Sequence, residues 1–164
     1  MHSMWRAVVL GVVVTLGVVL GAGIVSVSAQ SSDARIGTWK LHVEKSKYSP
    51  GPAPKSETLK IEASGQGEKV TTEGVNATGT PTMTQYTANF DGKDYPITGS
   101  QNFDTVSLKR IDARTTERTN KKGDKVVTTV TQVVSQDGKT MTTTVKGTNA
   151  QGQAVDNVTV WEKQ

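Results

Sequence analysis

The chain has 164 residues, no cysteine and a formal net charge of +4 from 19 basic and 15 acidic side chains. The lack of cysteine excludes disulfide bridges, thiolate nucleophiles and cysteine-type zinc sites, so the fold must depend on a packed core alone. A charge this small is far from the clustered basic footprint of nucleic-acid-binding proteins, and we exclude nucleic acid as a main partner.

Residues 1–29 have the composition of an export signal. Arg6 precedes an apolar or small-residue stretch over 7–27, and Val27-Ser28-Ala29 fits the small-residue rule for cleavage before Gln30. We therefore expect a signal helix and an exported, periplasmic or extracellular protein. The alternative is a retained inner-membrane anchor formed by residues 7–27, because about 20 apolar residues span a bilayer.

A polar lead-in over 30–35 precedes one domain over 36–164, a length that suits a single core. Residues 36–43 read IGTWKLHV, and their alternation of apolar and polar side chains has the period of two that is typical of a half-buried strand. Trp39 lies on the apolar face and His42 on the polar face. His42 is the only histidine after the leader, which excludes histidine-rich metal sites and two-histidine mechanisms.

The next segment, 44–55, contains three closely spaced prolines and is predicted to be an extended surface connection. Short segments rich in threonine, valine, isoleucine and tyrosine follow, separated by glycine-containing turns, and no stretch has the apolar spacing of a helix. The expected strands lie at 57–64, 69–74, 82–90, 95–99, 105–111, 125–134, 140–148 and 154–162, with a very polar segment at 114–120.

Sequential strands joined by short turns predict an all-β fold with a single antiparallel up-and-down sheet. A sheet with this many strands removes its exposed edges by closing on itself. We therefore expect a β-barrel of about 8–10 strands. Pro96 limits the segment that contains it to an edge or a bulge.

Both ends of the domain resemble calycins, the superfamily of lipocalins and fatty-acid-binding proteins. Gly37-Thr38-Trp39 is similar to the Gly-x-Trp opening of the first calycin strand, and VTVWEK at 158–163 is similar to the closing strand of a fatty-acid-binding protein. The resemblance implies a calycin-type barrel that holds a small apolar or amphipathic ligand. The family's carboxylate-binding arginine and tyrosine are replaced here by Thr159 and Trp161, and its helical lid by the proline-rich segment.

Aromatic side chains and one arginine are the candidate ligand contacts. Trp39 is either a cavity floor or a plug that closes the barrel bottom. The aromatic residues in the middle of the chain line a cavity if the barrel is hollow, and they form part of the core if it is filled. The number of strands decides whether the barrel is hollow. The candidates are Trp39, Tyr86, Phe90, Tyr95, Phe103, Arg110 and Trp161.

Arg110 shares a strand face with Val106 and Leu108, which predicts a guanidinium that points into the barrel and needs an anionic partner. In the alternative, Arg110 reaches water from the strand end, or a bulge turns Ile111 inward. Trp161 shares a face with Thr159 and is expected near the barrel rim.

The basic stretch 109–125 predicts either weak contact with an anionic envelope surface or a solvated hairpin that discourages aggregation. The acids Asp91, Asp124 and Asp137 adjoin turn glycines, where they shape the backbone, so we identify no catalytic residue, metal site or cofactor.

The sequence therefore predicts a secreted or periplasmic, monomeric, non-enzymatic protein that binds a small apolar or amphipathic molecule inside its barrel. The alternative is a filled-core barrel that acts as an envelope-associated interaction or structural module.

Overall fold

The protein forms a closed β-barrel in a computed structural model that describes residues 33–149 and 151–164. The predicted leader, its cleavage site and its possible role as an anchor lie outside the described residues. Within the described ranges, no helix reaches the length and apolarity needed to cross a bilayer.

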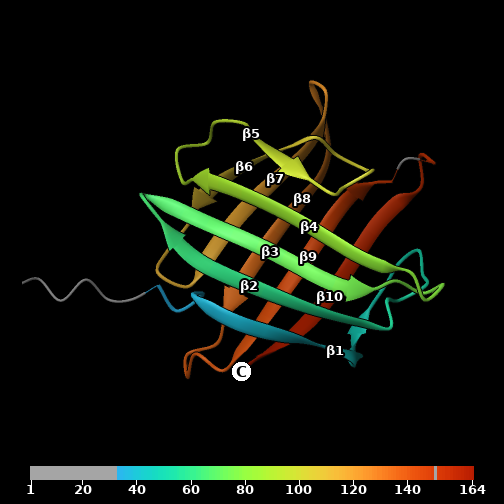
Figure 1. The fold of residues 1–164 in the computed structure, drawn as a ribbon, viewed down its shortest axis with the longest axis horizontal. Coiled ribbons are helices and arrows are strands. Elements are labelled where there is room, and N and C mark those ends of the chain that lie inside the picture. The colour runs from blue at the N-terminus through green and yellow to red at the C-terminus, as the bar shows by residue number, and fades with distance from the viewer. Residues whose placement is uncertain (1–32, 150) are drawn as a thin grey trace, which may run out of the picture. The chain divides into compact units, whose positions relative to one another are not determined.

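Each strand pairs antiparallel with the next along the chain, and β1 also pairs with β10, so that the sheet closes into one barrel (Figure 1). This arrangement confirms the predicted all-β, up-and-down antiparallel barrel, and ten strands is the upper end of the expected number. The strands are β1 (Gly37–Lys47), β2 (Ser56–Ser64), β3 (Gly67–Val75), β4 (Pro81–Asn89), β5 (Tyr95–Thr98), β6 (Thr105–Arg110), β7 (Thr115–Lys122), β8 (Lys125–Val134), β9 (Thr140–Thr148) and β10 (Ala154–Lys163).

The turn glycines do what the sequence predicts for them. Gly92 and Gly138, each directly after an aspartate, both have φ of 72°, a left-handed backbone that glycine adopts without steric cost. The carboxylates of Asp91 and Asp137 accept hydrogen bonds from the backbone N–H groups of Lys93 and Lys139 and so close these turns.

The two ends of the barrel differ. At one end, which we call the closed end, lie the β2–β3, β4–β5, β6–β7 and β8–β9 connections and the start of β1. The interior there is filled by side chains that are at most 2% exposed: Trp39, Ile61, Val70, Ala88, Leu108, Val134 and Met141. At the other end, the open end, lie the connections over 48–55, 76–80, 99–104 and 123–124 and the described residues 149 and 151–153 of the β9–β10 connection.

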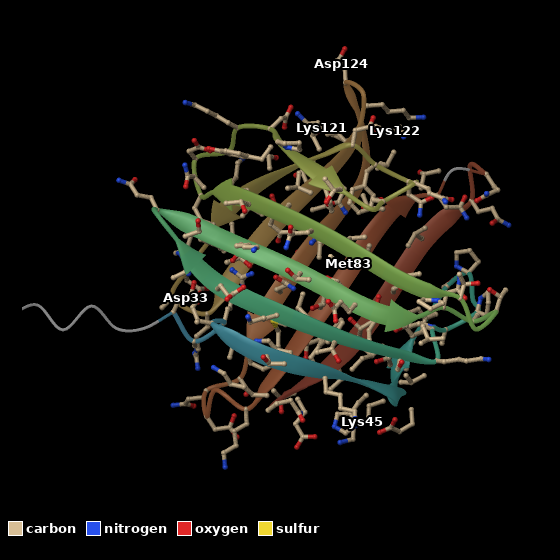
Figure 2. The ribbon with its side chains drawn as sticks, viewed as in Figure 1. Asp33, Lys45, Met83, Lys121, Lys122 and Asp124 are labelled. Carbon is tan, nitrogen blue, oxygen red and sulfur yellow. The ribbon has the colours of Figure 1, made fainter. Side chains whose placement is uncertain are left out.

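The polar segment 114–120 is largely part of β7, a full member of the barrel between β6 and β8. Its hairpin with β8 carries part of the basic stretch, and Figure 2 shows Lys121, Lys122 and Asp124 at its tip. Lys121 pairs with Asp94 and Lys122 with Asp104, each at 2.8 Å, so part of this positive charge is neutralised by the barrel's own acids.

Candidate functional site

The open half of the barrel contains a cavity of about 900 Å³ that reaches the solvent between the open-end connections. This volume falls in the range of roughly 300–1,000 Å³ that is typical of small-molecule sites. Its mouth is formed by parts of the proline-rich segment, the β3–β4 turn and the β5–β6 loop. Its larger apolar lining comes from Leu59, Ile97, Phe103, Val130, Val145 and Trp161.

The floor of the cavity combines an indole with polar groups. Trp161 is 6% exposed and donates its Nε1–H to Thr159 Oγ1 at 2.9 Å. Beside it, Gln132 lines the cavity and accepts a hydrogen bond from Arg35 at 2.9 Å. Gln132 therefore connects the cavity to the structure that seals the closed end.

That seal is a buried ion pair between the lead-in segment and β3. Arg35 and Glu68 are both 1% exposed and form two hydrogen bonds, of 2.6 and 3.1 Å. Glu68 also accepts a bond of 3.0 Å from the Tyr86 hydroxyl, and Trp39 donates its Nε1–H to the backbone oxygen of Arg35 at 2.8 Å. Arg35, at the end of the predicted lead-in, is thus part of the domain core, whereas the sequence suggested only a polar approach to it.

The wall of the cavity carries an acid and a base. Glu57 on β2 and Arg118 on β7 both line it. Burial raises the pKa of the Glu57 carboxyl, and the positive charge of Arg118 opposes that rise. Tyr48 lines the mouth, and burial together with the charge of Glu57 raises the pKa of its phenol to about 12. Arg118 lies over the ring of Tyr86, with 5.5 Å from its Cζ to the ring centre.

Two of the predicted ligand contacts lie in the cavity, Phe103 and Trp161. Trp39 is completely buried at the closed end and acts as the plug that the sequence offered as one alternative. Tyr86 is also closed-end core, because its hydroxyl belongs to the Glu68 network. Neither lines the cavity.

Phe90 and Tyr95 lie outside the cavity because both belong to the β4–β5 region near the closed end. Phe90 packs against the core between two guanidinium groups, with Arg110 Cζ 4.1 Å and Arg35 Cζ 5.9 Å from its ring centre. Tyr95 packs partly on the core and donates its hydroxyl to Asp91 at 2.8 Å. Their expected positions as cavity liners are corrected accordingly.

The predicted inward orientation of Arg110 is also wrong. Arg110 is the last residue of β6, and its side chain is exposed, stacks on Phe90 and pairs with Asp33 at 2.5 Å. The alternative in which this arginine reaches solvent from the strand end is the one observed. β6 ends at Arg110, so the alternation of the strand no longer holds its side chain in the interior.

The cavity's own charged groups, Glu57 and Arg118, were missed at the sequence level. A signal for Arg118 exists: Thr116, Arg118 and Asn120 alternate within the polar segment and occupy the inward register of β7. A strand that is polar on both faces has no alternation of apolar and polar residues. Periodicity alone therefore did not reveal which face of this segment points inward.

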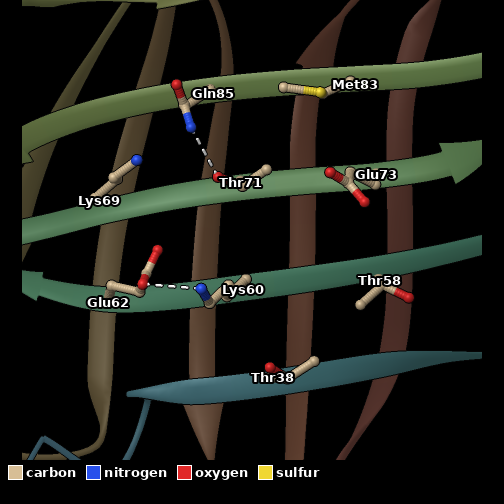
Figure 3. Close-up of a pocket in the computed structure, with 9 residues that line it drawn as sticks. All are labelled: Thr38, Thr58, Lys60, Glu62, Lys69, Thr71, Glu73, Met83 and Gln85. Carbon is tan, nitrogen blue, oxygen red and sulfur yellow. Dashed lines mark hydrogen bonds and ion pairs between the residues drawn. The ribbon is translucent and has the colours of Figure 1, made fainter.

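A second, smaller hollow of about 350 Å³ lies on the outer face of β1–β4 (Figure 3). Two pairs of its polar side chains interact: Lys60 with Glu62 at 2.9 Å, and Gln85 with Thr71 at 3.0 Å. Its other charged side chains, Lys69 and Glu73, lie on the same solvated outer face. This is ordinary for the outside of a sheet, and we assign the hollow no site.

His42 lies on the outer surface, as its strand position predicts. Its ring nitrogens contact Glu44 at 2.7 Å and Glu162 at 2.6 Å, and these hydrogen bonds raise its pKa above 6.5. Among the residues with described positions, no group of three histidine, aspartate or glutamate side chains could hold a metal ion.

No protein-family model and no curated protein matches the chain. Among solved structures, the chain is similar to zebrafish ileal bile acid-binding protein complexed with cholic acid. The two share 14% sequence identity with a TM-score of 0.49, and the match covers 80% of this chain and 99% of that chain. The fold assignment does not depend on this similarity, because it rests on the pairing of the chain's own strands: a closed ten-stranded antiparallel barrel that is packed at one end and hollow at the other.

Proposed function

We propose that this protein is a non-enzymatic binding protein that holds a small apolar or amphipathic molecule in the open half of its barrel. The observation that carries the proposal is the cavity of about 900 Å³, which is open to solvent and has apolar walls with a few charged and polar groups. Such a combination is typical of small-molecule sites, where apolar walls supply affinity and a few polar groups fix orientation.

The filled-core alternative fits only the closed half of the barrel. In that half, Trp39 and the Arg35–Glu68 pair fill the interior. The open half has no such packing, and a purely structural module has no use for a cavity of this size. We extend the proposal to an exported protein on the composition of residues 1–29. We also propose a monomer, because the closed barrel leaves none of the described strands with a sheet edge that could pair with a second copy.

The test uses the full chain and two matched variants. Val145→Phe places a larger side chain in the cavity, whereas Val133→Phe adds the same volume to the exposed face of the neighbouring strand. Titration with dodecanoate, followed by the fluorescence of the cavity-lining Trp161, should show equal affinity for wild type and Val133→Phe. Val145→Phe should bind at least about tenfold more weakly, a loss of about 1.4 kcal/mol.

Native mass spectrometry of the purified protein provides a second readout, since a bound small molecule should be retained by wild type and lost from Val145→Phe. The proposal fails if wild type binds neither dodecanoate nor a co-purifying molecule. It also fails if Val145→Phe binds as well as Val133→Phe, because the probe would then be bound outside the barrel.

A further inference from the structure

Glu57 and Arg118 face each other across the cavity. β2 and β7 are five steps apart in either direction around the ten-stranded barrel, which places them on opposite walls. Glu57 is the second residue of β2 and adjoins the proline-rich segment at the mouth. Arg118 lies in the middle of β7 opposite Val130, a residue that is 1% exposed, and is therefore deeper.

Among the described residues, the deep arginine lacks an anionic partner, although its guanidinium lies over the ring of Tyr86. Within the described part of the chain, Arg118 forms no ion pair, and its Nε–H is buried without a hydrogen-bond acceptor. The hydroxyl of Thr143, which also lines the cavity, is buried and unpartnered as well. A buried donor left without an acceptor is costly, and a charged one more so.

The acid at the mouth is equally unsatisfied. Glu57 has no hydrogen bond or ion pair to any described residue, and the Tyr48 hydroxyl near it is buried without a partner. The two charges do not satisfy each other, since no carboxylate oxygen lies within 4.0 Å of the Arg118 guanidinium. Between them lie apolar side chains that include Leu59, Val145 and Trp161.

We propose that the ligand is an amphiphile with two polar ends: an anionic group held by Arg118 inside the barrel, and a hydroxyl or ammonium donor held by Glu57 and Tyr48 at the mouth. This proposal rests on the proposed function and names the ligand class of the same cavity. An anion beside Arg118 forms charge-assisted hydrogen bonds, a donor beside Glu57 satisfies the carboxylate, and the hydrocarbon between them contacts the apolar wall.

The test compares twelve-carbon ligands that differ only at their ends: dodecanol, dodecanoate, 12-hydroxydodecanoate and 12-aminododecanoate. A ten-carbon series with the same end groups tests which length better fits the separation of Arg118 and Glu57. Binding to the full chain is measured by isothermal titration calorimetry. We expect dodecanoate to bind about tenfold more tightly than dodecanol, and a hydroxy or amino acid to bind about tenfold more tightly than the plain acid. A preference for the amino over the hydroxy compound identifies the donor as a cation, and the reverse identifies it as a hydroxyl.

Four variants assign the two ends. Arg118→Gln should reduce the preference for acid over alcohol to less than about threefold, while Arg114→Gln, which changes an exposed arginine of the β6–β7 turn, should leave it unchanged. Glu57→Gln should tighten dodecanoate binding, by removing a like charge, and abolish the preference for a second polar end. Glu73→Gln on the outer face of β3 is its control.

Circular dichroism melts confirm that each variant is folded, and the ranking of the four compounds on wild type needs no variant. The ligand-class proposal is overturned if wild type binds alcohol, acid and hydroxy acid equally, or if Arg114→Gln changes the preference as much as Arg118→Gln. In both cases binding itself remains and the proposed function stands. If no compound binds but wild type retains a co-purifying molecule, only the ligand class fails. If no compound binds and no molecule is retained, the proposed function and the ligand class fail together.

Discussion

Arg35 is the residue whose observed environment differs most from the one that its sequence neighbours predict. It lies in a polar lead-in, yet its guanidinium is 1% exposed and pairs with Glu68 inside the closed end. A buried ion pair of this kind contributes little compared with apolar packing, but removing one partner leaves an uncompensated charge. Arg35 is therefore held in the barrel by a contact whose loss is strongly destabilising.

Glu68→Gln is expected to lower the free energy of unfolding by about 3–5 kcal/mol, because it leaves Arg35 buried without its carboxylate. Urea unfolding measures the change, and Glu73→Gln, on the outer face of the same strand, should cost less than about 0.5 kcal/mol. A double variant, Arg35→Met with Glu68→Met, should recover much of the loss. Equal effects of the two single glutamate substitutions would contradict this account.

His42 predicts a pH dependence of stability. Its pKa is raised by hydrogen bonds to Glu162 and Glu44, so the folded protein binds the proton more tightly than the unfolded chain. The resulting stabilisation is fully present below the unfolded pKa of 6.5 and is lost as the pH rises through the higher folded pKa. His42→Gln should therefore reduce the fall in stability between about pH 6 and 8, measured by urea unfolding at each pH. An unchanged slope would show that other groups cause it.

At the scale of elements, β5 is the weakest part of the wall. Its register with β4 extends only over Gln85–Thr98 and Tyr86–Ile97, and Pro96 cannot donate a ladder hydrogen bond. The prediction that Pro96 limits its segment to an edge or a bulge is wrong, because β5 pairs with both β4 and β6 inside the closed barrel. The proline is accommodated by the short pairing. The β5–β6 loop that follows forms part of the cavity mouth.

Hydrogen exchange should reflect this difference between strands. We expect the amides of Tyr95, Ile97 and Thr98 to exchange at least about tenfold faster than those of Thr142–Val145 on β9, which pairs along most of its length with both neighbours. Mass spectrometry of peptides from the native protein measures both sets under the same conditions. Equal protection would mean that the barrel opens as one unit.

Glycine allows one close approach between strands of the open end. A Cβ at Gly147 would lie 2.1 Å from the backbone oxygen of Val127, and its φ of 151° is one that other residues rarely adopt. β8 and β9 can therefore stay paired as they reach the rim of the cavity. The same strands carry Val130, Thr143 and Val145 into the cavity wall.

At the scale of the molecule, the barrel is divided into a packed half and a hollow half. The packed half contains Trp39, Met141 and the Arg35–Glu68 pair, and it holds the strands in register. The hollow half has unsatisfied polar groups on its cavity wall, at Tyr48, Arg118 and Thr143. Rigid support below a partly polar cavity is the arrangement that a preorganised binding site requires.

The sequence by itself determined the all-β class, the meander and the closure, because the period of two and the turn glycines are local signals that each strand carries alone. It also placed His42 outside and offered Trp39 as a plug. Only the tertiary structure decided which end is hollow and which polar side chains face inward. Glu57, Arg118 and Arg35 look like surface residues until the opposite wall is known, because the burial of a charge depends on partners far away along the chain. Arg110 also depends on a distant partner. The alternation of its strand predicts an inward side chain, but the side chain pairs with Asp33 outside the cavity.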